Sequence, residues 1–569
     1  MRDLSCTVGF FNSVPIAIVF LAVGLGFLVG RLRIGPVELG GVCGTLIVAL
    51  LLGQTGCQAS FQVKDIAFAL FIFAMGYSGG PGFFANLNRS SVRFMVLPLV
   101  EAVLVLGIAL MAARLFGFDP GTTAGLAAGA ATESAVVGTA SEALRHLGLN
   151  AAQVQQMEAN IAIAYSLTYL VGMISIVIFT SQVAPVLLGI DLRKASKELE
   201  EKLGGVPDKD KDNLPALPRL VGRTHLVRVA DGRDVGAVEA ELGGRTVITR
   251  ILRNGIAVPA NRAEILRSGD IVVVLGLRGF ALRANELVGP EIDLPAAHAE
   301  ALNLREKQVV VNRKTVYGHT LAELARRAEA SAAARGVFLV RLERAGMELP
   351  ILPSTTVQYG DVVTLVGTDP ELTEAVQRLG GELRRDGMTD LVFLSAGILA
   401  GLLIGSLAVT LDGIPLSLGS GGGALISGLI CGWIAAKRPG VGHIPAPALS
   451  LLKELGLAIF IACVGLSAGP QAITLLKEHG LVLPLLGLLV SLGPACASLW
   501  IGHKILKIEG PLLLGAIAGQ HVSTPTVSAV IAKAGSSIPL LGYTVTYAIA
   551  NVLLPVLGPL IVALAFHAS

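Results

Sequence analysis

Long apolar stretches occupy both ends of the chain and enclose a polar, charged middle. Residues from about 14 to 190 and from about 388 to 567 are apolar, whereas those from about 191 to 387 are not. A helix needs about 20 apolar residues to cross a bilayer, so the pattern predicts a polytopic α-helical membrane protein with a polar insertion. Six apolar segments lie in each block, at 14–30, 37–57, 65–85, 92–116, 120–144 and 159–190, then at 388–409, 416–436, 450–475, 481–502, 511–535 and 540–566.

These changes in polarity also set the expected domain boundaries. We expect a first transmembrane repeat over 1–190, a linker over 191–218, two small domains over 219–292 and 293–387, and a second transmembrane repeat over 388–569. The linker is rich in Lys, Asp and Pro, a composition typical of flexible segments.

The two apolar blocks resemble each other along their length. Residues 64–81 and 453–470 share Lys, Ala, Phe, Ile, Gly, Ser, Gly and Pro in register at a constant offset of 389. Other glycines match in the same order. The pattern indicates that one membrane domain was duplicated.

The positions of Lys and Arg predict how the halves are oriented. Cytoplasmic loops are enriched in these residues. All the basic clusters lie inside if the N-terminus is outside and the fifth segment of each half, 120–144 and 511–535, enters the membrane and returns on the same side. Each half then makes five crossings, so the second is inverted relative to the first, with re-entrant hairpins approaching from opposite faces. The alternative is six full spans per half and a parallel repeat.

Composition supports a membrane protein and excludes other classes. The chain is 53% hydrophobic and 15% charged, with a mean hydropathy of +0.71, whereas soluble domains carry about 25% charged residues. A net charge of +3 gives no indication of a nucleic-acid partner. The six cysteines form no C-x-x-C pair. We therefore expect neither a metal site nor a disulfide framework, and interpret the cysteines as small packing residues.

The polar middle contains a repeat of its own, at an offset of 91. Arg250, Arg253, Gly255 and Gly269-Asp270 correspond to Arg341, Arg344, Gly346 and Gly360-Asp361. Each copy predicts a strand, a glycine turn and a second, β-branched strand, and the Gly-Asp pairs are typical of turns. This pattern resembles the C-terminal ligand-binding domain of potassium-conductance regulators, the RCK_C type. The resemblance implies two cytoplasmic α/β domains that bind an unidentified regulatory ligand; a spacer or dimerisation role is the alternative.

The duplicated motif Gly-x-Ser-x-Gly-Pro is the first candidate site. Proline removes a backbone N–H and glycine tolerates unusual dihedral angles, so we expect each helix to end or break there. Ser78 and Gly80, with Ser467 and Gly469, would then present hydroxyls and free backbone groups to a substrate. The alternative is a helix terminus at the membrane surface.

The middle of each fifth segment is the second candidate site. Small and hydroxyl residues cluster there, as expected for a hairpin tip followed by a helix N-terminus, whose amides attract carboxylates. Hydroxyls that bond back to their own helix are the alternative. The candidates are Thr132, Glu133 and Ser134 in the first tip and Gln520, His521, Ser523, Thr524 and Thr526 in the second.

Ionisable residues inside a membrane are costly and therefore indicate function. Glu133 could exchange a proton or balance a substrate ammonium group, and His521 could titrate near neutrality; both could instead reach water at a hairpin mouth. Glu101 lies close to the start of its expected helix, and Lys64 and Lys453 precede matching helices. All three are interpreted as interfacial; substrate contact is the alternative for the two lysines.

Polar residues of the sixth segments could line the path or hold helices together. They are Asn160, Tyr165, Tyr547 and Asn551, of which Asn551 is included among the candidate substrate-binding residues.

Taken together, the paired motifs, the paired tips and the two inserted domains resemble the aspartate:alanine exchanger family over nearly the whole chain. The resemblance implies a secondary transporter of the bacterial inner membrane, without cofactor or metal, that exchanges amino acids or small carboxylates. A homodimer is expected. The alternatives are a monovalent-cation transporter or channel gated by the middle domains, and a membrane sensor that transports nothing. An enzyme is not expected, because the polar block shows no nucleophile–base pair.

Overall fold

The computed structural model describes most of the chain. The described residues are 11, 14–34, 37–57, 60–86, 91–203, 220–243, 246–258, 260–277, 283–292, 305–329, 336–344, 347–367, 369–382, 389–411, 414–417, 419–438 and 441–568. Two compact units emerge, one of residues 1–199, 344–349 and 386–569 and one of residues 200–343 and 350–385.

The first unit is helical and contains the apolar blocks. Within the described residues, seven helices are long and apolar enough to cross a membrane, which supports a polytopic membrane protein. The elements of its first half are α2 (Ile16–Gly30), β1 (Arg33–Ile34), β2 (Val37–Glu38), α3 (Gly41–Gly53), α4 (Phe61–Asn86), α5 (Val92–Phe116), α6 (Pro120–Ala130), α7 (Ser134–Arg145), α8 (Ala151–Ile178), the π-helix η1 (Phe179–Val183), α9 (Ala184–Leu187) and α10 (Leu192–Lys202).

The second half repeats this order. Its elements are α16 (Leu391–Gly405), β12 (Ala408–Leu411), β13 (Ile414–Ser417), α17 (Gly419–Lys437), α18 (Ala446–His479), α19 (Val482–Trp500), η5 (Ile501–Ile505), α20 (Gly510–Gln520), α21 (Thr524–Ala534) and α22 (Pro539–Ala568). The short strand β9 (Met347–Glu348) also falls in this unit.

Contacts between the halves occur in reciprocal pairs. Helix α4 packs on α17 while α18 packs on α3, and α5 packs on α22 while α19 packs on α8. In each case the second contact is the first one with every helix replaced by its counterpart in the other half. Such reciprocal contacts are expected of two similar domains related by an approximate two-fold axis.

The fifth segment of each half forms a helical hairpin. Helix α6 runs along α8, since a Cβ at Gly121 would meet Met157 and one at Gly129 would meet Tyr165. Helix α7 returns toward the starting end of α8, where Arg145 contacts Glu158 at 3.2 Å. In the second half, α20 packs along α22 in the same way, with Gly515 against Pro539 and Gly519 against Tyr543.

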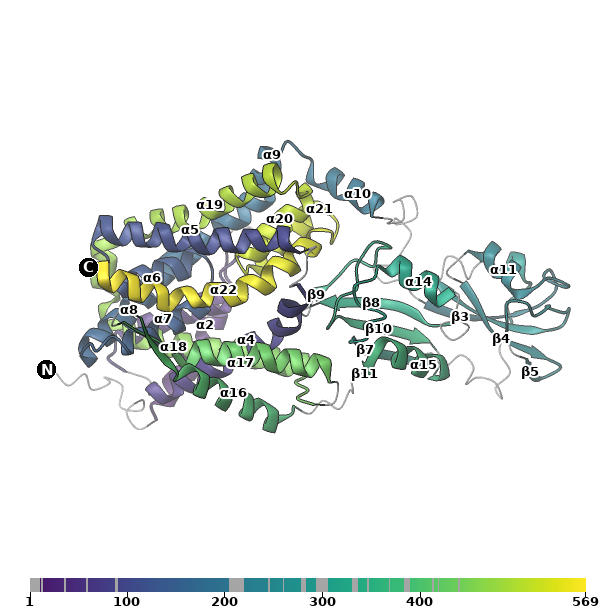
Figure 1. Ribbon diagram of the computed structural model, residues 1–569, viewed down its shortest axis with the longest axis horizontal. Helices are drawn as coiled ribbons and strands as arrows, with labels where there is room; N and C mark the ends of the chain where they lie inside the picture. The colour runs from purple at the N-terminus through teal and green to yellow at the C-terminus, as the bar shows by residue number, and fades with distance from the viewer. Residues whose placement is uncertain are drawn as a thin grey trace. The chain divides into compact units, whose positions relative to one another are not determined.

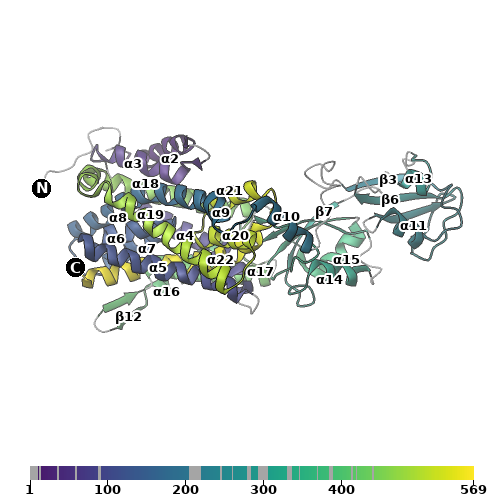
Figure 2. The same ribbon diagram turned by 90° about the horizontal axis from the view of Figure 1, so that it is seen from above.

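The two hairpins lie at opposite ends of the bundle. Helix α7 packs beside the later part of α22, where Thr139 Oγ1 donates to Pro555 O at 2.8 Å, whereas α20 packs beside its beginning. Figures 1 and 2 show α6 and α7 toward one end of this unit and α20 and α21 toward the other.

The second unit contains two antiparallel sheets with helices (Figure 1). The first sheet has the order β3-β6-β4-β5 and the second contains β11-β7-β10-β8. The order β3-β6-β4 therefore recurs as β7-β10-β8, and Gly269 and Gly360 occupy equivalent turns with φ of 91° and 85°. The Gly-Asp pairs are thus turn residues, as the sequence indicates.

The bounds of the elements in this second unit are as follows. They are β3 (Leu220–Leu226), α11 (Val235–Leu242), β4 (Thr246–Arg253), β5 (Ile256–Val258), β6 (Ile271–Leu277), α13 (Ala284–Leu287), β7 (Arg305–Val311), α14 (Leu321–Glu329), β8 (Phe338–Arg344), β10 (Val362–Gly367), α15 (Asp369–Leu379) and β11 (Gly380–Glu382).

The cysteines correct one expectation. Cys43, Cys431, Cys463 and Cys496 are free, but Cys57, just beyond α3, is disulfide-bonded. The spacing argument fails here because the absence of C-x-x-C motifs does not exclude a disulfide between cysteines at other spacings.

Candidate functional site

The first hairpin tip comprises Ala131, Thr132 and Glu133, between α6 and α7. Thr132 has a φ of 56°, a left-handed conformation that lets the chain reverse direction. Glu133 caps α7, because its Oε1 accepts from the Ala135 amide at 3.0 Å. Ser134 Oγ lies 2.7 Å from the Tyr165 hydroxyl of α8. The predicted helix N-terminus therefore begins at this tip.

The second tip, His521 to Ser523, has the same construction. Val522 takes the left-handed conformation with a φ of 51°, and Ser523 caps α21 by accepting from the Thr526 amide at 3.4 Å. The Thr526 hydroxyl lies 2.6 Å from Ser523 Oγ. Thr524 Oγ1 lies 3.5 Å from the Tyr543 hydroxyl.

Tyrosine pairs stand beside both tips. The rings of Tyr165 and Tyr169 are 5.2 Å apart on α8, and those of Tyr543 and Tyr547 are 5.0 Å apart on α22. In each half the first tyrosine contacts the first residue of the returning helix, so the two tips are built on one plan.

The two tips meet. Thr132 Oγ1 of the first tip donates to the main-chain carbonyl of His521 in the second at 2.7 Å. These residues are 389 apart in sequence, so the structure joins the two clusters that the sequence predicts separately.

Several buried polar atoms around the tips have no hydrogen-bond partner among the described residues. They include Glu133 Oε2, both amide atoms of Gln520 and Asn551 Oδ1. Gln520 is 0% exposed and Glu133 and Asn551 are 3% exposed. An unpaired buried polar group costs roughly 1–3 kcal/mol in mutational data, and such groups mark a place where something polar can bind.

Glu101 was missed by the sequence argument. The expectation that it is interfacial is wrong, because its side chain is 0% exposed on α5 and its Oε1 lies 2.8 Å from His521 Nδ1. His521 is also 0% exposed, with Nε2 3.1 Å from Ser491 O. The expectation that His521 could reach water is therefore corrected too. The available signal was that Glu101 is an acidic residue within an apolar helix. Its partner, His521, lies in the second hairpin, which is far away in the sequence.

The Gly-x-Ser-x-Gly-Pro motifs do not break their helices. Helix α4 continues through Pro81 to Asn86, and α18 continues through Pro470 to His479. Prolines inside membrane helices are tolerated because neighbouring groups satisfy the freed backbone.

The glycines of these motifs serve close helix packing. A Cβ at Gly80 would overlap Leu429 O of α17, and one at Gly469 would overlap the backbone of Gly53 in α3. Gln54 Nε2 also donates to Gly469 O.

The motif serines bond within their own helices. Ser78 Oγ donates to Met75 O and Ser467 Oγ to Cys463 O, each at 3.0 Å. Among the hydrogen bonds of the described residues, none links either serine to a tip. Their role in substrate binding stays a prediction.

The paired lysines differ. Lys64, interpreted as interfacial, is 4% exposed and donates to Glu158 Oε2 at 2.8 Å, a correction to that expectation. Lys453 is partly buried, with Nζ 3.5 Å from Ser78 Oγ.

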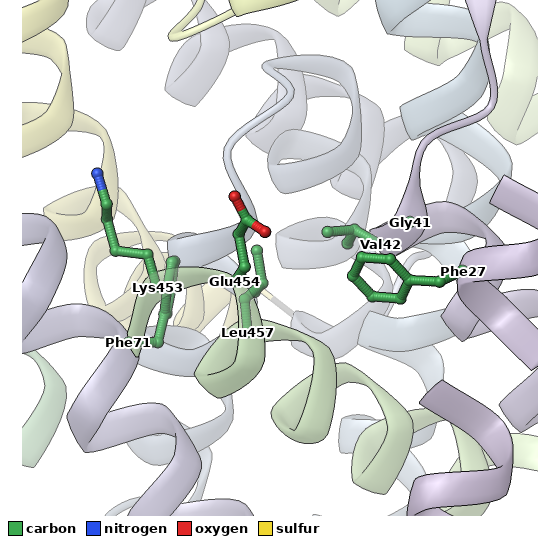
Figure 3. Close-up of a pocket in the computed structure, with 7 residues that line it drawn as sticks. All are labelled: Phe27, Gly41, Val42, Phe71, Lys453, Glu454 and Leu457. Atoms are coloured by element: carbon green, nitrogen blue, oxygen red, sulfur yellow. The ribbon is translucent and has the colours of Figure 1, made fainter. Parts of the chain in front are cut away.

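Lys453 lines a pocket of about 270 Å³ between α2, α3, α4 and α18. In Figure 3 the Glu454 carboxylate lies between the Lys453 side chain and the Phe27 ring. The other lining residues are Gly41, Val42, Phe71 and Leu457, so the wall is mainly apolar and includes neither tip.

Asn160 and Tyr165 hold elements together, since Asn160 Nδ2 donates to Asp119 Oδ2 at 3.0 Å and Tyr165 contacts Ser134. Over the residues that the structure describes, no cluster of three His, Cys, Asp or Glu side chains could hold a metal ion.

Comparison with known proteins places the chain in a family. A family model for the membrane region of aspartate–alanine exchangers, described as a predicted permease membrane region, matches residues 18–185 and 393–563. An uncharacterized transporter of Bradyrhizobium diazoefficiens is 39% identical over 557 residues, covering 98% of both chains. One of Zymomonas mobilis is 36% identical over 554 residues, covering 97% of this chain and 98% of its own. No solved structure matches. The two matched regions are the two helical halves that carry the tips, and the chain therefore belongs to this permease family and is a multi-pass membrane transporter.

Proposed function

We propose that the protein is a secondary active antiporter that exchanges small carboxylates or amino acids at the two hairpin tips. The observation that carries this proposal is the meeting of two similarly built tips near buried polar atoms that lack partners among the described residues. A polar solute that binds there would satisfy those atoms.

The chemistry of the tips favours a carboxylate. Helices α7 and α21 both begin at the tips, and the amides at a helix N-terminus attract anions. The Gln520 amide can donate to a carboxylate oxygen, while Glu133 Oε2 and Asn551 Oδ1 can accept from an ammonium group. Hydroxyls of Ser134 and Thr524 lie beside these groups.

We further propose that the halves are inverted repeats and that each hairpin is re-entrant. The support is that the hairpins lie at opposite ends of α22 and that α6, of 11 residues, is only about 16 Å long at 1.5 Å per residue. Such a helix reaches about half-way through a 30 Å hydrocarbon layer. Tips that meet from opposite faces place the site near the midplane, where moving one part against the other gives alternating access.

The middle sheets are proposed to be cytoplasmic RCK_C-like domains that sense a regulatory ligand in an inner-membrane homodimer. Their recurring strand order and the basic clusters beside the apolar segments support this proposal. A ligand would change transport only if it binds two conformations unequally.

Counterflow in proteoliposomes tests the proposed function. Labelled aspartate should enter vesicles only when they contain unlabelled amino acid or dicarboxylate. Gln520→Leu, which keeps the side chain's size but removes its amide, should reduce counterflow at least tenfold, the effect of about 1.4 kcal/mol. Gln156→Leu replaces an exposed glutamine outside the tips and serves as the matched control.

Two results would contradict the proposal. Unchanged counterflow in Gln520→Leu would remove the tips from the binding site. Monovalent-cation flux without any organic substrate would instead support a cation transporter or channel.

A further inference from the structure

Glu101 and His521 form an ion pair that is completely buried. Both side chains are 0% exposed, and Glu101 Oε1 lies 2.8 Å from His521 Nδ1. Apart from the contact with His521, neither carboxylate oxygen of Glu101 has a hydrogen-bond partner among the described residues. A bare ionised carboxylate in such a place is very costly unless a positive charge or a proton compensates it.

The contact made by Nε2 of His521 determines which atoms of the Glu101–His521 pair carry protons. Nε2 lies 3.1 Å from the main-chain oxygen of Ser491, and a carbonyl oxygen can only accept, so Nε2 carries a hydrogen. Without a further proton, the lone pair of Nδ1 would face the Glu101 carboxylate at 2.8 Å. The geometry therefore requires one more proton in the pair, either on Nδ1 or on Glu101.

The groups around the pair supply no further positive charge among the described residues. Glu133 of the first tip interacts electrostatically with Glu101, and no Lys or Arg contact to either acid is present among the described residues. The remaining titratable neighbours of Glu133 are phenols, namely Tyr165, Tyr169 and Tyr547, with the Cys43 thiol beyond the first two. In the described surroundings His521 is thus the one side chain that can become a cation, and it is cationic only while this proton lies on Nδ1.

The same histidine joins the two tips. Its main-chain carbonyl accepts the hydrogen bond from Thr132 Oγ1 at 2.7 Å, and its side chain holds the second tip against Glu101 of α5 and Ser491 of α19. Loss of the proton turns the contact with Glu101 from attractive to repulsive, which releases the histidine and with it the tip contact.

We propose that the Glu101–His521 pair is the binding site of a coupling proton, which holds the two tips together and leaves to water when they separate. This inference deepens the proposed function and rests on it for the claim that transport is coupled to a proton gradient. The proton is released to the side on which the tips open and is taken up again when the pair re-forms.

A substrate-free measurement tests the proton site on its own. Thermal unfolding of the full chain in nanodiscs is followed from pH 5.5 to 8.5 for wild type, Glu101→Gln and the control His503→Gln, which changes an exposed histidine. The folded pair keeps a proton that an unfolded histidine loses above about pH 6.5. The unfolding midpoint of wild type and of the control should therefore fall more steeply with rising pH than that of Glu101→Gln, in which a neutral amide replaces the carboxylate.

Parallel curves for wild type and Glu101→Gln would overturn the proposal. If Glu101→Gln does not fold, the double variant Glu101→Gln with His521→Gln, neutral at both positions, provides the same comparison.

A transport measurement separates this proposal from the proposed function. In vesicles, a difference of one pH unit should shift the steady-state labelled aspartate ratio of wild type by up to about tenfold, the limit for one coupled proton, and should not shift that of Glu101→Gln. Equal responses in the two proteins would overturn the coupling. If no protein transports aspartate while the unfolding curves still differ, the proton site stands and the proposed substrate fails.

Discussion

At the scale of single residues, the sequence reasoning named polar candidates in both tips but did not anticipate all of their contacts. Glu133 and Gln520 have buried polar atoms that lack partners among the described residues, and their role in binding is a proposal. Glu101 was misplaced because the apolar segment around it gives no sign of the histidine that it meets 420 residues later. Long-range pairing of this kind depends on how the helices pack, which one sequence does not reveal.

Ser78 and Ser467 provide a prediction at this scale. Their hydroxyls bond to carbonyls one turn earlier, so replacing either serine by alanine loses about 1 kcal/mol or less of folding free energy. Both variants should therefore fold, as measured by size-exclusion yield. The sequence hypothesis that these hydroxyls face the substrate path further predicts weaker uptake in Ser78→Ala and Ser467→Ala, measured by counterflow. Unaltered uptake in both variants would exclude these serines from the substrate path.

At the scale of elements, the turn within each fifth segment was predicted, whereas the continuity of α4 and α18 was not. The segments 120–144 and 511–535 each contain the predicted turn, at Thr132 and Val522. The helix breaks expected at Pro81 and Pro470 are wrong, because α4 and α18 continue through them. The same pattern of glycine and proline occurs where a helix breaks and where two helices cross closely. The sequence of one segment does not distinguish the two cases, because the difference depends on the helix that packs against it.

Because α4 and α17 cross closely, adding a single methyl group at their contact should lower the stability of the protein. A Cβ at Gly80 would overlap the Leu429 carbonyl, whereas one at Gly107 of α5 meets nothing within 4 Å. Gly80→Ala should therefore destabilise the protein by about 1–3 kcal/mol, as overpacking does. Gly107→Ala should be neutral or slightly stabilising, because alanine favours helix. Equal unfolding midpoints for the two variants would contradict the packing role.

At the scale of the whole molecule, the inverted arrangement is a proposal that the positions of the basic residues bear on. Arg193, in the basic cluster that follows segment 159–190 and that the charge rule places inside, lies beside Gly535 at the base of the second hairpin. Arg145, at the base of the first, is an exception to the basic-inside pattern, and it is paired with Asp65 and Glu158. The sequence predicts the duplication and the insertion of the middle region, whereas the meeting of the tips becomes evident only in three dimensions.

Labelling from the two sides of the membrane tests the central claim most directly. His146, exposed at the base of the first hairpin, and Lys533, exposed near the base of the second, are replaced one at a time by cysteine in a chain lacking the free cysteines. The inverted arrangement predicts that a membrane-impermeant maleimide labels His146→Cys in spheroplasts and Lys533→Cys only after the membrane is permeabilised. Labelling of both positions from the same side would contradict hairpins that enter from opposite faces.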